Sequence, residues 1–428
     1  MSSPLVPDHF SLEFAVRPNI LTFPKYITST SDDVKARSAI SLDANENSAG
    51  SCLAAGSMVP CCMQDIIDMG NLNRYPSASH KALRQQIAQW RQLKCIITLT
   101  HLIVTAAIDH LCLGSGASDI LDLIIRATCT PGRDTLLIAP PTFELYRVCA
   151  TLHEVRVKEC AQELTAEGDF RLPIEEICTT LSTDDRIRVV FLASPGNPTG
   201  SLIPLPQIQR ILDLKEFRGI AVVDEAYIDF AVASERASAL RLLPKYNNLI
   251  VVQSLSKYHG LAGIRVGMAI AHPILTGILA KVQMPYKLSS VALSLAYQAL
   301  SAKGLDRARE LQRQIMDNRA ALIRILGDPT LARNGVGRPI GGNAANFVVV
   351  PIHARTIEAS SPSSLPELGK RDDMRARRIV DRLRDAHGIA VRYVGGQPSC
   401  TGCMRITVGT VKEMEALRTA LECVLREC

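Results

Sequence analysis

Short apolar segments alternate with amphipathic segments through the middle of the chain. Continuous apolar runs separated by stretches of helical spacing are typical of strands buried on both faces of a mainly parallel sheet. The pattern therefore predicts an α/β fold whose large domain has three layers, with helices on either side of the sheet. The predicted strands are Leu111–Gly116, Thr135–Ala139, Ile187–Ala193, Ile220–Val223, Leu249–Val252 and Val266–Ala271.

A second region follows, in which strands and helices alternate after a long helix at Asp306–Leu326. This order indicates a smaller α+β domain. We expect residues 1–75 to form an N-terminal arm and part of the small domain, residues 76–309 the large domain, and residues 310–428 the small domain. Further expected elements are an extended arm over 1–40, a helix at Lys81–Leu93, strands at Ala345–Pro351, Ile389–Tyr393 and Met404–Val408, helices at Asp372–Ala386 and Lys412–Arg426, and a Ser/Pro-rich loop at Ala354–Lys370.

Polar motifs follow several of the predicted strands. A Pro-Gly-Asn-Pro-Thr-Gly turn containing Asn197 follows one strand, and Asp224, with Tyr227 three residues later, follows the next. In open parallel sheets ligands bind at the carboxyl ends of the strands, so we expect these residues to meet. A third strand ends in glycines, where Ser118 is expected to cap a helix that offers backbone N–H groups to a phosphate. A plain turn between strand and helix is the alternative for this feature.

The stretch Ser254–Gly267 places a lysine and an arginine close together. Lys257 follows an apolar strand beside two serines, Ser254 and Ser256, and Arg265 lies in a glycine-rich turn eight residues later. Burial disfavours the charge of a lysine, and hydroxyls with an arginine suit a bound phosphate. An amine beside a phosphate anchor is what a pyridoxal phosphate (PLP) pocket requires. On these residues alone, a solvated loop lysine is the alternative.

Composition narrows the class of protein. Of the 428 residues, 47% are apolar and 21% charged, which is ordinary for a globular protein. The net charge of +6 is spread along the chain and is too small to indicate nucleic acid binding. The thirteen cysteines are irregularly spaced, and the Cys400-Thr-Gly-Cys403 pair lacks the second pair that a structural zinc site uses. We therefore expect reduced thiols and no metal.

Targeting signals and membrane spans are not indicated. The first ten residues lack a basic segment followed by an apolar core. The segment Cys95–Leu113 is the most apolar, but His and Asp residues interrupt it, and a membrane helix needs about 20 predominantly apolar residues. We expect a soluble, cytoplasmic protein without a membrane partner. An organellar transit peptide stays open, although Asp8 and Glu13 argue against one.

The polar motifs, taken together, resemble those of the fold type I PLP-dependent aminotransferases. The similarity is greater to the histidinol-phosphate aminotransferase family, and it extends from Arg17 to Thr410. The residues that carry the general resemblance are Asn197, Asp224, Tyr227, Lys257, Arg265 and Arg405. Those that carry the narrower one are Leu42-Asp-Ala-Asn-Glu46, Asn73-Arg-Tyr-Pro76, Ile124-Ile-Arg-Ala127, Pro140-Pro-Thr142, Asp224-Glu-Ala-Tyr227 and Gly402-Cys-Met-Arg-Ile-Thr-Val-Gly409.

The resemblance implies a role for each residue that contacts the cofactor ring. Lys257 would bind PLP as a Schiff base and then move a proton between the substrate and the cofactor. Asp224 would pair with the pyridine nitrogen. Asn197 and Tyr227 would hydrogen-bond the phenolate oxygen, and Asn197 would also line the substrate site. Phe143 stands where the family usually has a tyrosine stacked on the ring; a core phenylalanine is the alternative.

The resemblance also implies a phosphate site shared between two subunits. Tyr75 resembles a tyrosine that reaches the cofactor phosphate from the neighbouring subunit, so a homodimer with shared active sites is expected. The other phosphate ligands would be Ser254, Ser256, Arg265 and the backbone N–H groups of Ala117 and Ser118.

Two arginines and a tyrosine are the implied substrate contacts. Arg405 resembles the arginine that binds the substrate carboxylate, and Arg392 matches a second arginine for the anion. The planar guanidinium suits carboxylate and phosphate alike. Tyr26 lies where an N-terminal tyrosine closes over the substrate, but a packed residue of the arm is an equal alternative.

The implied reaction is transamination of L-histidinol phosphate with 2-oxoglutarate, which gives imidazole acetol phosphate and glutamate in histidine biosynthesis. The alternatives are an aminotransferase for aromatic or other amino acids, a decarboxylase of the threonine-phosphate type, and a PLP-binding paralogue without turnover. Two departures from the family pattern stand out. Gly116-Ala117-Ser118-Asp119 has one acid fewer, and residues 93–109 are longer and more apolar than expected.

Overall fold

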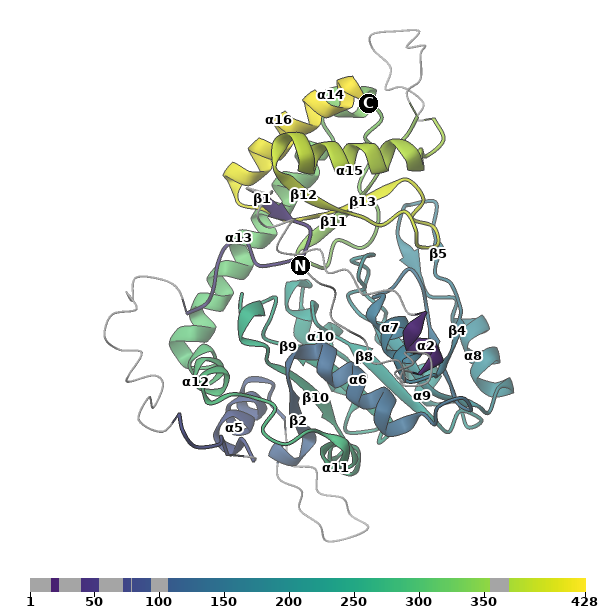
Figure 1. Cartoon of the computed structure of the whole chain (residues 1–428), viewed down its shortest axis with the longest axis vertical. Coiled ribbons are helices and arrows are strands. Elements are labelled where there is room, and N and C mark those ends of the chain that lie inside the picture. Colours follow the sequence, from purple (N-terminus) through teal and green to yellow (C-terminus); the bar gives the residue numbers. More distant parts are fainter. Residues whose placement is uncertain (1–16, 23–39, 54–71, 78, 94–106, 355–368) are drawn as a thin grey trace, which may run out of the picture.

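Two sheets organise the molecule, a large one below and a small one above in the view of Figure 1. The computed structural model describes residues 17–22, 40–53, 72–77, 79–93, 107–354 and 369–428. In the large sheet, β10 runs antiparallel to its neighbours β2 and β9, and the remaining pairs are parallel. Its order is β2 (Leu111–Gly114), β10 (Gly267–Ala271), β9 (Leu249–Ser254), β8 (Ile220–Asp224), β7 (Ile187–Ala193), β3 (Thr135–Ile138) and β4 (Arg156–Glu159).

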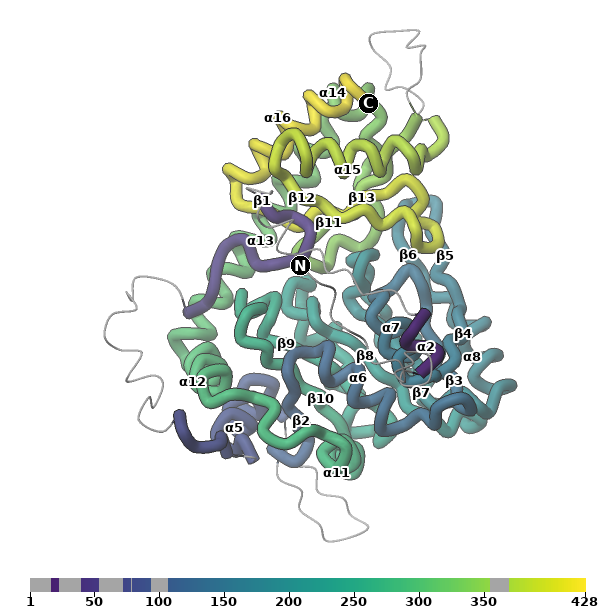
Figure 2. The backbone as a smooth tube through the Cα atoms, viewed as in Figure 1, coloured from purple at the N-terminus to yellow at the C-terminus, as the bar shows by residue number. Residues whose placement is uncertain are grey.

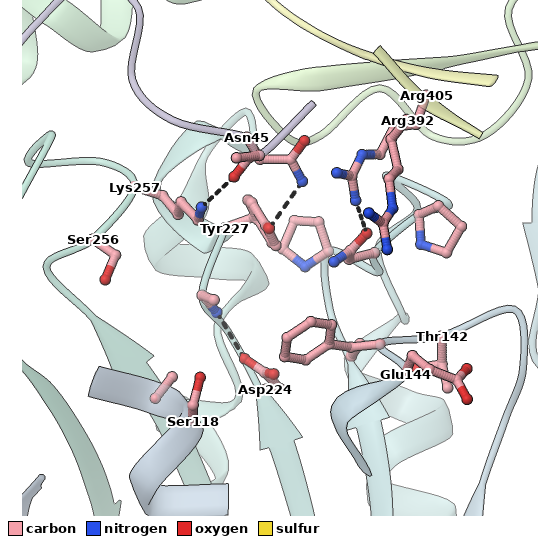
Figure 3. A pocket seen from close by; sticks show the side chains of 18 of the residues that line it. Asn45, Ser118, Thr142, Glu144, Asp224, Tyr227, Ser256, Lys257, Arg392 and Arg405 are labelled. Carbon is pink, nitrogen blue, oxygen red and sulfur yellow. Dashed lines mark hydrogen bonds between the residues drawn. The ribbon is translucent and has the colours of Figure 1, made fainter. Parts of the chain in front are cut away.

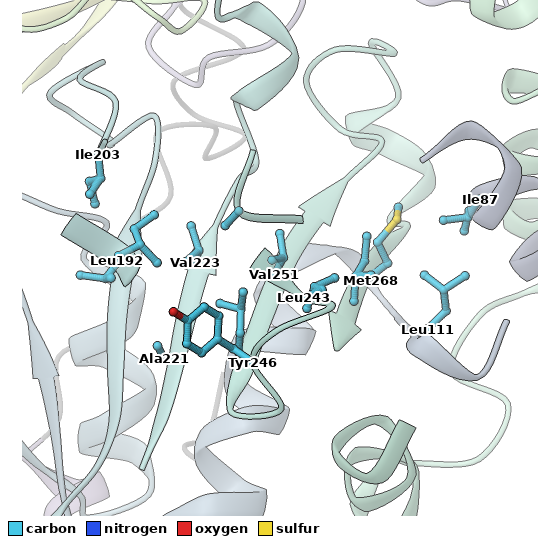
Figure 4. Packing of buried hydrophobic residues seen from close by; sticks show 14 of the residues in the cluster. Ile87, Leu111, Leu192, Ile203, Ala221, Val223, Leu243, Tyr246, Val251 and Met268 are labelled. Atoms are coloured by element: carbon cyan, nitrogen blue, oxygen red, sulfur yellow. The ribbon is translucent and has the colours of Figure 1, made fainter. Parts of the chain in front are cut away.

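Helices cover both faces of the large sheet. Side chains of β9 alternate between two hydrophobic clusters: Val251 belongs to one, and Ile250 and Val252 belong to the other. Both faces are therefore buried, which is why whole strands are apolar. Figure 4 shows the first cluster. The helices that contribute to this cluster include α5 (Lys81–Trp90), α8 (Ile174–Thr183), α9 (Leu205–Leu212) and α12 (Ser290–Ala299). The opposite face of the sheet packs against α6 (Gly116–Thr128), α7 (Leu145–Leu152) and α11 (Pro273–Val282).

The small sheet combines the N-terminal segment with the C-terminal region. β1 (Ile40–Leu42) pairs in parallel with β12 (Ile389–Tyr393), and the trace in Figure 2 shows these two strands, which are distant in sequence, side by side. α13 (Ala302–Leu326) contributes Leu311 to the core of the large sheet and Leu322 to that of the small one. The proposed division of the chain at 309 stays a prediction. The other elements are β13 (Cys403–Thr407), β11 (Phe347–Pro351), α14 (Pro329–Arg333), α15 (Asp373–His387) and α16 (Val411–Glu427).

The predicted α/β fold class is confirmed. The prediction of an extended arm is wrong for residues 17–22. Pro18 begins a short helix there, α2 (Pro18–Leu21), because proline suits the first helical position. The side chains of Arg17 and Asn19 donate to backbone carbonyls at the end of α7. Short remaining elements are β5 (Glu163–Leu164), β6 (Phe170–Arg171), α10 (Ser234–Ala237) and the 3₁₀ turns η2 (Ala107–His110), η3 (Ile228–Phe230), η4 (Ala239–Leu242) and η5 (Ala262–Ile264).

Three predictions lie wholly or mostly outside the described residues: the remainder of the arm, the apolar segment after Leu93, and the Ser/Pro-rich loop. Within the described part of the chain, none of the helices combines the length and the apolar character needed to span a bilayer. Cys400 and Cys403 are buried, and burial raises the pKa of their thiols to about 12 and about 11.

Candidate active site

A cavity of about 560 Å³ opens between the edge of the large sheet and the small sheet. The carboxyl ends of β7, β8 and β9 form its floor, and residues of β12 and β13 face them from above (Figure 3). Its volume suits a small ligand. The predicted site residues that line it are Ala117, Ser118, Phe143, Asn197, Asp224, Tyr227, Ser254, Ser256, Lys257, Arg265, Arg392 and Arg405.

Lys257 points into this cavity from the loop after β9. Its Nζ donates to the carbonyl of Ala44, 2.8 Å away. Burial lowers the pKa of the Lys257 amine to about 8, and the positive charge of Arg405 acts in the same direction. A lysine with a lowered pKa is neutral more often near neutral pH, and a neutral amine can act as a nucleophile or a base.

Asp224 lies at the bottom of the cavity, where β8 ends. The Tyr146 hydroxyl donates to Oδ2 at 2.8 Å, and the Ala226 backbone N–H donates to Oδ1 at 3.1 Å. Burial raises the pKa of Asp224, whereas both hydrogen bonds lower it. The carboxylate is thus held in place by two donors in an apolar setting, which suits the binding of a cationic ring N–H.

The N-terminus of α6 provides a site for an anion. Gly267 of β10 lies so close to it that an added Cβ would come within 2.4 Å of the Ala117 nitrogen. An added Cβ at Gly116, where φ is +81°, would come within 2.3 Å of Arg265 Nη2. The absence of side chains therefore lets the guanidinium approach the exposed N–H groups of the helix, where an anion is favoured. Nearby, the hydroxyls of Ser254 and Ser256 are 2.8 Å apart.

The prediction that Ser118 caps this helix is wrong. The helix begins at Gly116, so Ser118 lies in its first turn, and the cap residue is Ser115, whose side chain makes no capping bond. Instead, Asp119 Oδ2 accepts from the Ser115 backbone N–H at 2.8 Å. The acid retained in the Gly-Ala-Ser-Asp segment therefore reaches back to the cap residue, as the acid of a capping box does, and leaves the first N–H groups of the helix without a side-chain acceptor from Ser115.

Two arginines lie side by side at the opposite end of the cavity. Arg392 and Arg405 are directly paired across β12 and β13, so their side chains leave the same face of the small sheet. Arg405 Nη1 donates to Asn197 Oδ1 at 2.6 Å, and its Nη2 donates to the Asp43 carbonyl at 2.5 Å. Two guanidinium groups at one end of a cavity favour a carboxylate or a phosphate ester.

Two predicted residues are located away from the cavity or outside the structure. Tyr75 is 79% exposed and stacks on Tyr286, with the ring centroids 4.3 Å apart, and it does not line the cavity of its own chain. Tyr26 lies outside the described residues. Phe143 lines the cavity, and its ring contacts that of Tyr146 edge to face, so its aromatic surface is available to a ligand.

Sequence reasoning assigned no role to Tyr146 or Asn45. Tyr146 lies in α7, where the apolar residues have the spacing of any amphipathic helix. The sequence pattern therefore gave no sign that the Tyr146 hydroxyl donates to Asp224. Asn45 lies in the quoted Leu42–Glu46 motif, and its Nδ2 donates to the Tyr227 hydroxyl at 3.0 Å. Gln397 also lines the cavity, and its Oε1 accepts from the Thr142 backbone N–H at 2.7 Å.

Comparisons with known proteins place this geometry in a family. The chain matches aminotransferase class I and II over residues 37–421. Histidinol-phosphate aminotransferase from Schizosaccharomyces pombe is 34% identical over 420 residues, which is 98% of each chain. The enzyme of that name from Candida maltosa is 33% identical and covers 98% of this chain and 99% of its own.

Solved structures show the same fold. Histidinol-phosphate aminotransferase from Sinorhizobium meliloti, in complex with pyridoxal-5′-phosphate, has a TM-score of 0.76 at 23% identity, over 98% of this chain and 99% of that one. The corresponding protein from Clostridium acetobutylicum has a TM-score of 0.71 at 21% identity, over 91% of this chain and all of that one. This chain therefore belongs to the class I and II aminotransferase family, as its motifs predicted.

Proposed function

We propose that this protein is a PLP-dependent histidinol-phosphate aminotransferase, which transfers the amino group of L-histidinol phosphate to 2-oxoglutarate. Relatives of that name are 32–34% identical to it over 94–98% of this chain. The observation that carries the proposal is one cavity with Lys257 and Asp224 at one end and a pair of arginines at the other. The products are imidazole acetol phosphate and glutamate.

The residues of the cavity fit PLP. The close approach of Gly267 and Arg265 to the start of α6 forms a cradle for a phosphate group, with the Ser254 and Ser256 hydroxyls beside it. Lys257 supplies the amine, and the buried Asp224 supplies an anion for the ring nitrogen. When bound at Lys257, PLP supplies a protonated ring that withdraws the electron pair left on the substrate α-carbon.

The protein's own groups then have separate tasks. Asp224, held by Tyr146, keeps the ring nitrogen protonated. Asn197 and Tyr227 donate to the phenolate oxygen and orient the ring. Lys257, with its pKa lowered to about 8, takes the proton from the α-carbon and returns it to the neighbouring carbon of the cofactor.

The arginine pair accounts for two different substrates. Histidinol phosphate presents a phosphate ester where glutamate and 2-oxoglutarate present a carboxylate. Arg405 and Arg392, paired on adjacent strands, offer planar donors that suit either anion. Substrate binding also uses Asn197, which already accepts from Arg405.

The assembly that we propose is a homodimer with shared active sites, located in the cytoplasm. Tyr75 is exposed in the single chain and would reach the phosphate site of the partner subunit. Its location outside the cavity of its own chain supports this assignment.

A comparison of three amines tests the proposed substrate. Purified, PLP-loaded protein is mixed separately with histidinol phosphate, phenylalanine and threonine phosphate, and the absorbance of the lysine-bound cofactor is followed. We expect rapid loss of that absorbance with histidinol phosphate. Rapid loss with phenylalanine alone would favour an aromatic aminotransferase, and release of CO₂ from threonine phosphate a decarboxylase. Loss with none of the three would favour a paralogue without turnover.

A further inference from the structure

Asn45 is a buried residue whose polar groups are all engaged. Its side chain is 1% exposed, and its backbone adopts the left-handed conformation, with φ at +52°. Its backbone N–H donates to Thr407 Oγ1 at 3.0 Å, and its backbone carbonyl accepts from Asn346 Nδ2 at 3.1 Å. The residue is therefore fixed at both its main chain and its side chain.

The hydrogen bonds around Asn45 define the orientation of its amide group. A backbone N–H can only donate, so Thr407 Oγ1 is the acceptor in that bond. The Thr407 hydroxyl donates in turn to Asn45 Oδ1, 3.1 Å away. With the amide oxygen on this side, the group that faces the Tyr227 hydroxyl at 3.0 Å is the donor Nδ2 (Figure 3).

The direction of this last bond determines the role of the Tyr227 hydroxyl. Because the amide nitrogen brings its own hydrogen, the phenol oxygen accepts, and the phenol proton is not used on Asn45. We propose that Asn45 is a positioning residue that makes Tyr227 a hydrogen-bond donor toward the cofactor oxygen. This inference rests on the proposed PLP site and on the assignment of Tyr227 to the phenolate oxygen.

Asn45 also links the two sheets. Thr407 lies on β13 and Asn346 precedes β11, both in the small sheet, whereas Tyr227 follows β8 of the large sheet. The orientation of a hydroxyl in the floor of the cavity is therefore set from the small sheet.

A pH titration of the cofactor absorbance tests the inference. A donor to the phenolate oxygen stabilises its anionic form and lowers the pKa of the nitrogen that joins Lys257 to the cofactor. In Asn45→Asp the carboxylate can only accept, so the Tyr227 proton turns toward it. We expect the midpoint of the titration to rise by about one pH unit. In Asn45→Gly, the glycine can adopt the positive φ of this position, and the donor is lost without the addition of a charge. This variant should raise the midpoint by less than Asn45→Asp does.

A double mutant separates the relay from a direct effect of charge. In the Tyr227→Phe background, Asn45→Asp should leave the midpoint where Tyr227→Phe alone puts it, because the hydroxyl through which Asn45 acts is gone. An equal rise with and without the hydroxyl would mean that the new charge acts directly, and would overturn the proposal.

Thr407 provides a second, independent set of variants. Thr407→Ser keeps the hydroxyl and should titrate like the wild type, whereas Thr407→Val should raise the midpoint. Wild-type midpoints in Asn45→Gly and Thr407→Val would also overturn the proposal. If the wild-type protein converts histidinol phosphate but the Asn45 variants keep the wild-type midpoint, only this inference is overturned. If the wild-type protein forms no absorbance of a lysine-bound cofactor, the proposed function is overturned.

Discussion

Tyr146 supports Asp224 from inside the protein. Its ring is completely buried and stacks on Phe191, with the centroids 4.9 Å apart, and its hydroxyl donates to the carboxylate. Burial alone would favour the protonated acid, because desolvation raises the pKa of Asp224. The hydrogen bond opposes that effect, because it stabilises the ionised carboxylate that the proposed contact with the ring nitrogen requires.

Replacement of Tyr146 by Phe tests this contact. A hydrogen bond to a charged group contributes about 1.5–3 kcal/mol, so kcat should fall about 10- to 100-fold. Tyr246→Phe is the matched control, because its hydroxyl also donates to an aspartate, Asp213, but away from the cavity. Steady-state kinetics give kcat for both variants, and the control should keep the wild-type kcat. A wild-type kcat in Tyr146→Phe would contradict the proposed role of this hydroxyl.

The reactivity of Lys257 should depend on pH differently from that of an ordinary lysine. Because its pKa is lowered to about 8, the neutral amine increases as the pH rises through 8 instead of through the higher range of exposed lysines. Acylation of the cofactor-free protein, followed residue by residue with mass spectrometry, measures this midpoint. Lys257 in the same protein unfolded in denaturant serves as the control. Equal Lys257 midpoints in the folded and the unfolded protein would contradict the lowered pKa of this amine.

Strand-end residues were predictable, whereas their supporting contacts were not. Asn197, Asp224 and Lys257 each follow an apolar strand, and parallel strands bring their carboxyl ends to one edge. Tyr146 was missed because the spacing of α7 shows which residues are buried, not which one carries a hydroxyl to a distant carboxylate. Asn45 was quoted in a motif, but its contact with Tyr227 depends on the pairing of β1 with β12, which is remote in sequence.

At the scale of elements, the start of α6 depends on glycines in two segments. Gly116 begins the helix and Gly267 lies against it in β10, with an added Cβ at Gly267 only 2.3 Å from the Gly116 carbonyl carbon. The predicted start of this helix was three residues late, because the preference for a serine cap pointed to Ser118, whereas the cap residue is Ser115 and Asp119 accepts from its N–H group.

Gly267→Ala should therefore displace the helix from the strand. The clash is with backbone atoms, which cannot rotate away, so we expect a loss of about 1–3 kcal/mol in stability and weaker binding of PLP. Gly263→Ala is the control, since an added Cβ there has no atom within 4 Å. Thermal unfolding and cofactor titration of the two variants provide the comparison, and equal behaviour would rule out the close contact as a requirement.

At the scale of the whole molecule, the site lies where two separately built sheets meet. The large sheet contributes the lysine, the aspartate and the phosphate cradle, and the small sheet contributes the arginine pair. The fold class followed from strand periodicity, and residues 1–75 were expected to contribute to the small domain. The specific pairing of β1 with β12 was not predicted, because pairing between segments so distant in sequence leaves no local signal.

Hybrid dimers test whether active sites are shared. In the proposed homodimer, Lys257→Ala and Tyr75→Ala would each impair both sites, but a hybrid of the two variants would have one site with an intact Lys257 and an intact Tyr75. Random exchange of equal amounts should restore about a quarter of wild-type activity. Activity no higher than the mean of the two parents after exchange would place Tyr75 outside the partner's site.

In the proposed reaction, the same cavity catalyses both half-reactions of the amino-group transfer from histidinol phosphate to 2-oxoglutarate. The most direct measurement adds histidinol phosphate to PLP-loaded protein, removes excess substrate, and then adds 2-oxoglutarate. We predict loss of the lysine-bound cofactor absorbance in the first step, its return in the second, and one glutamate formed per active site. The same sequence in Lys257→Ala should give neither change. Failure of the absorbance to return, or its return without glutamate, would contradict the account.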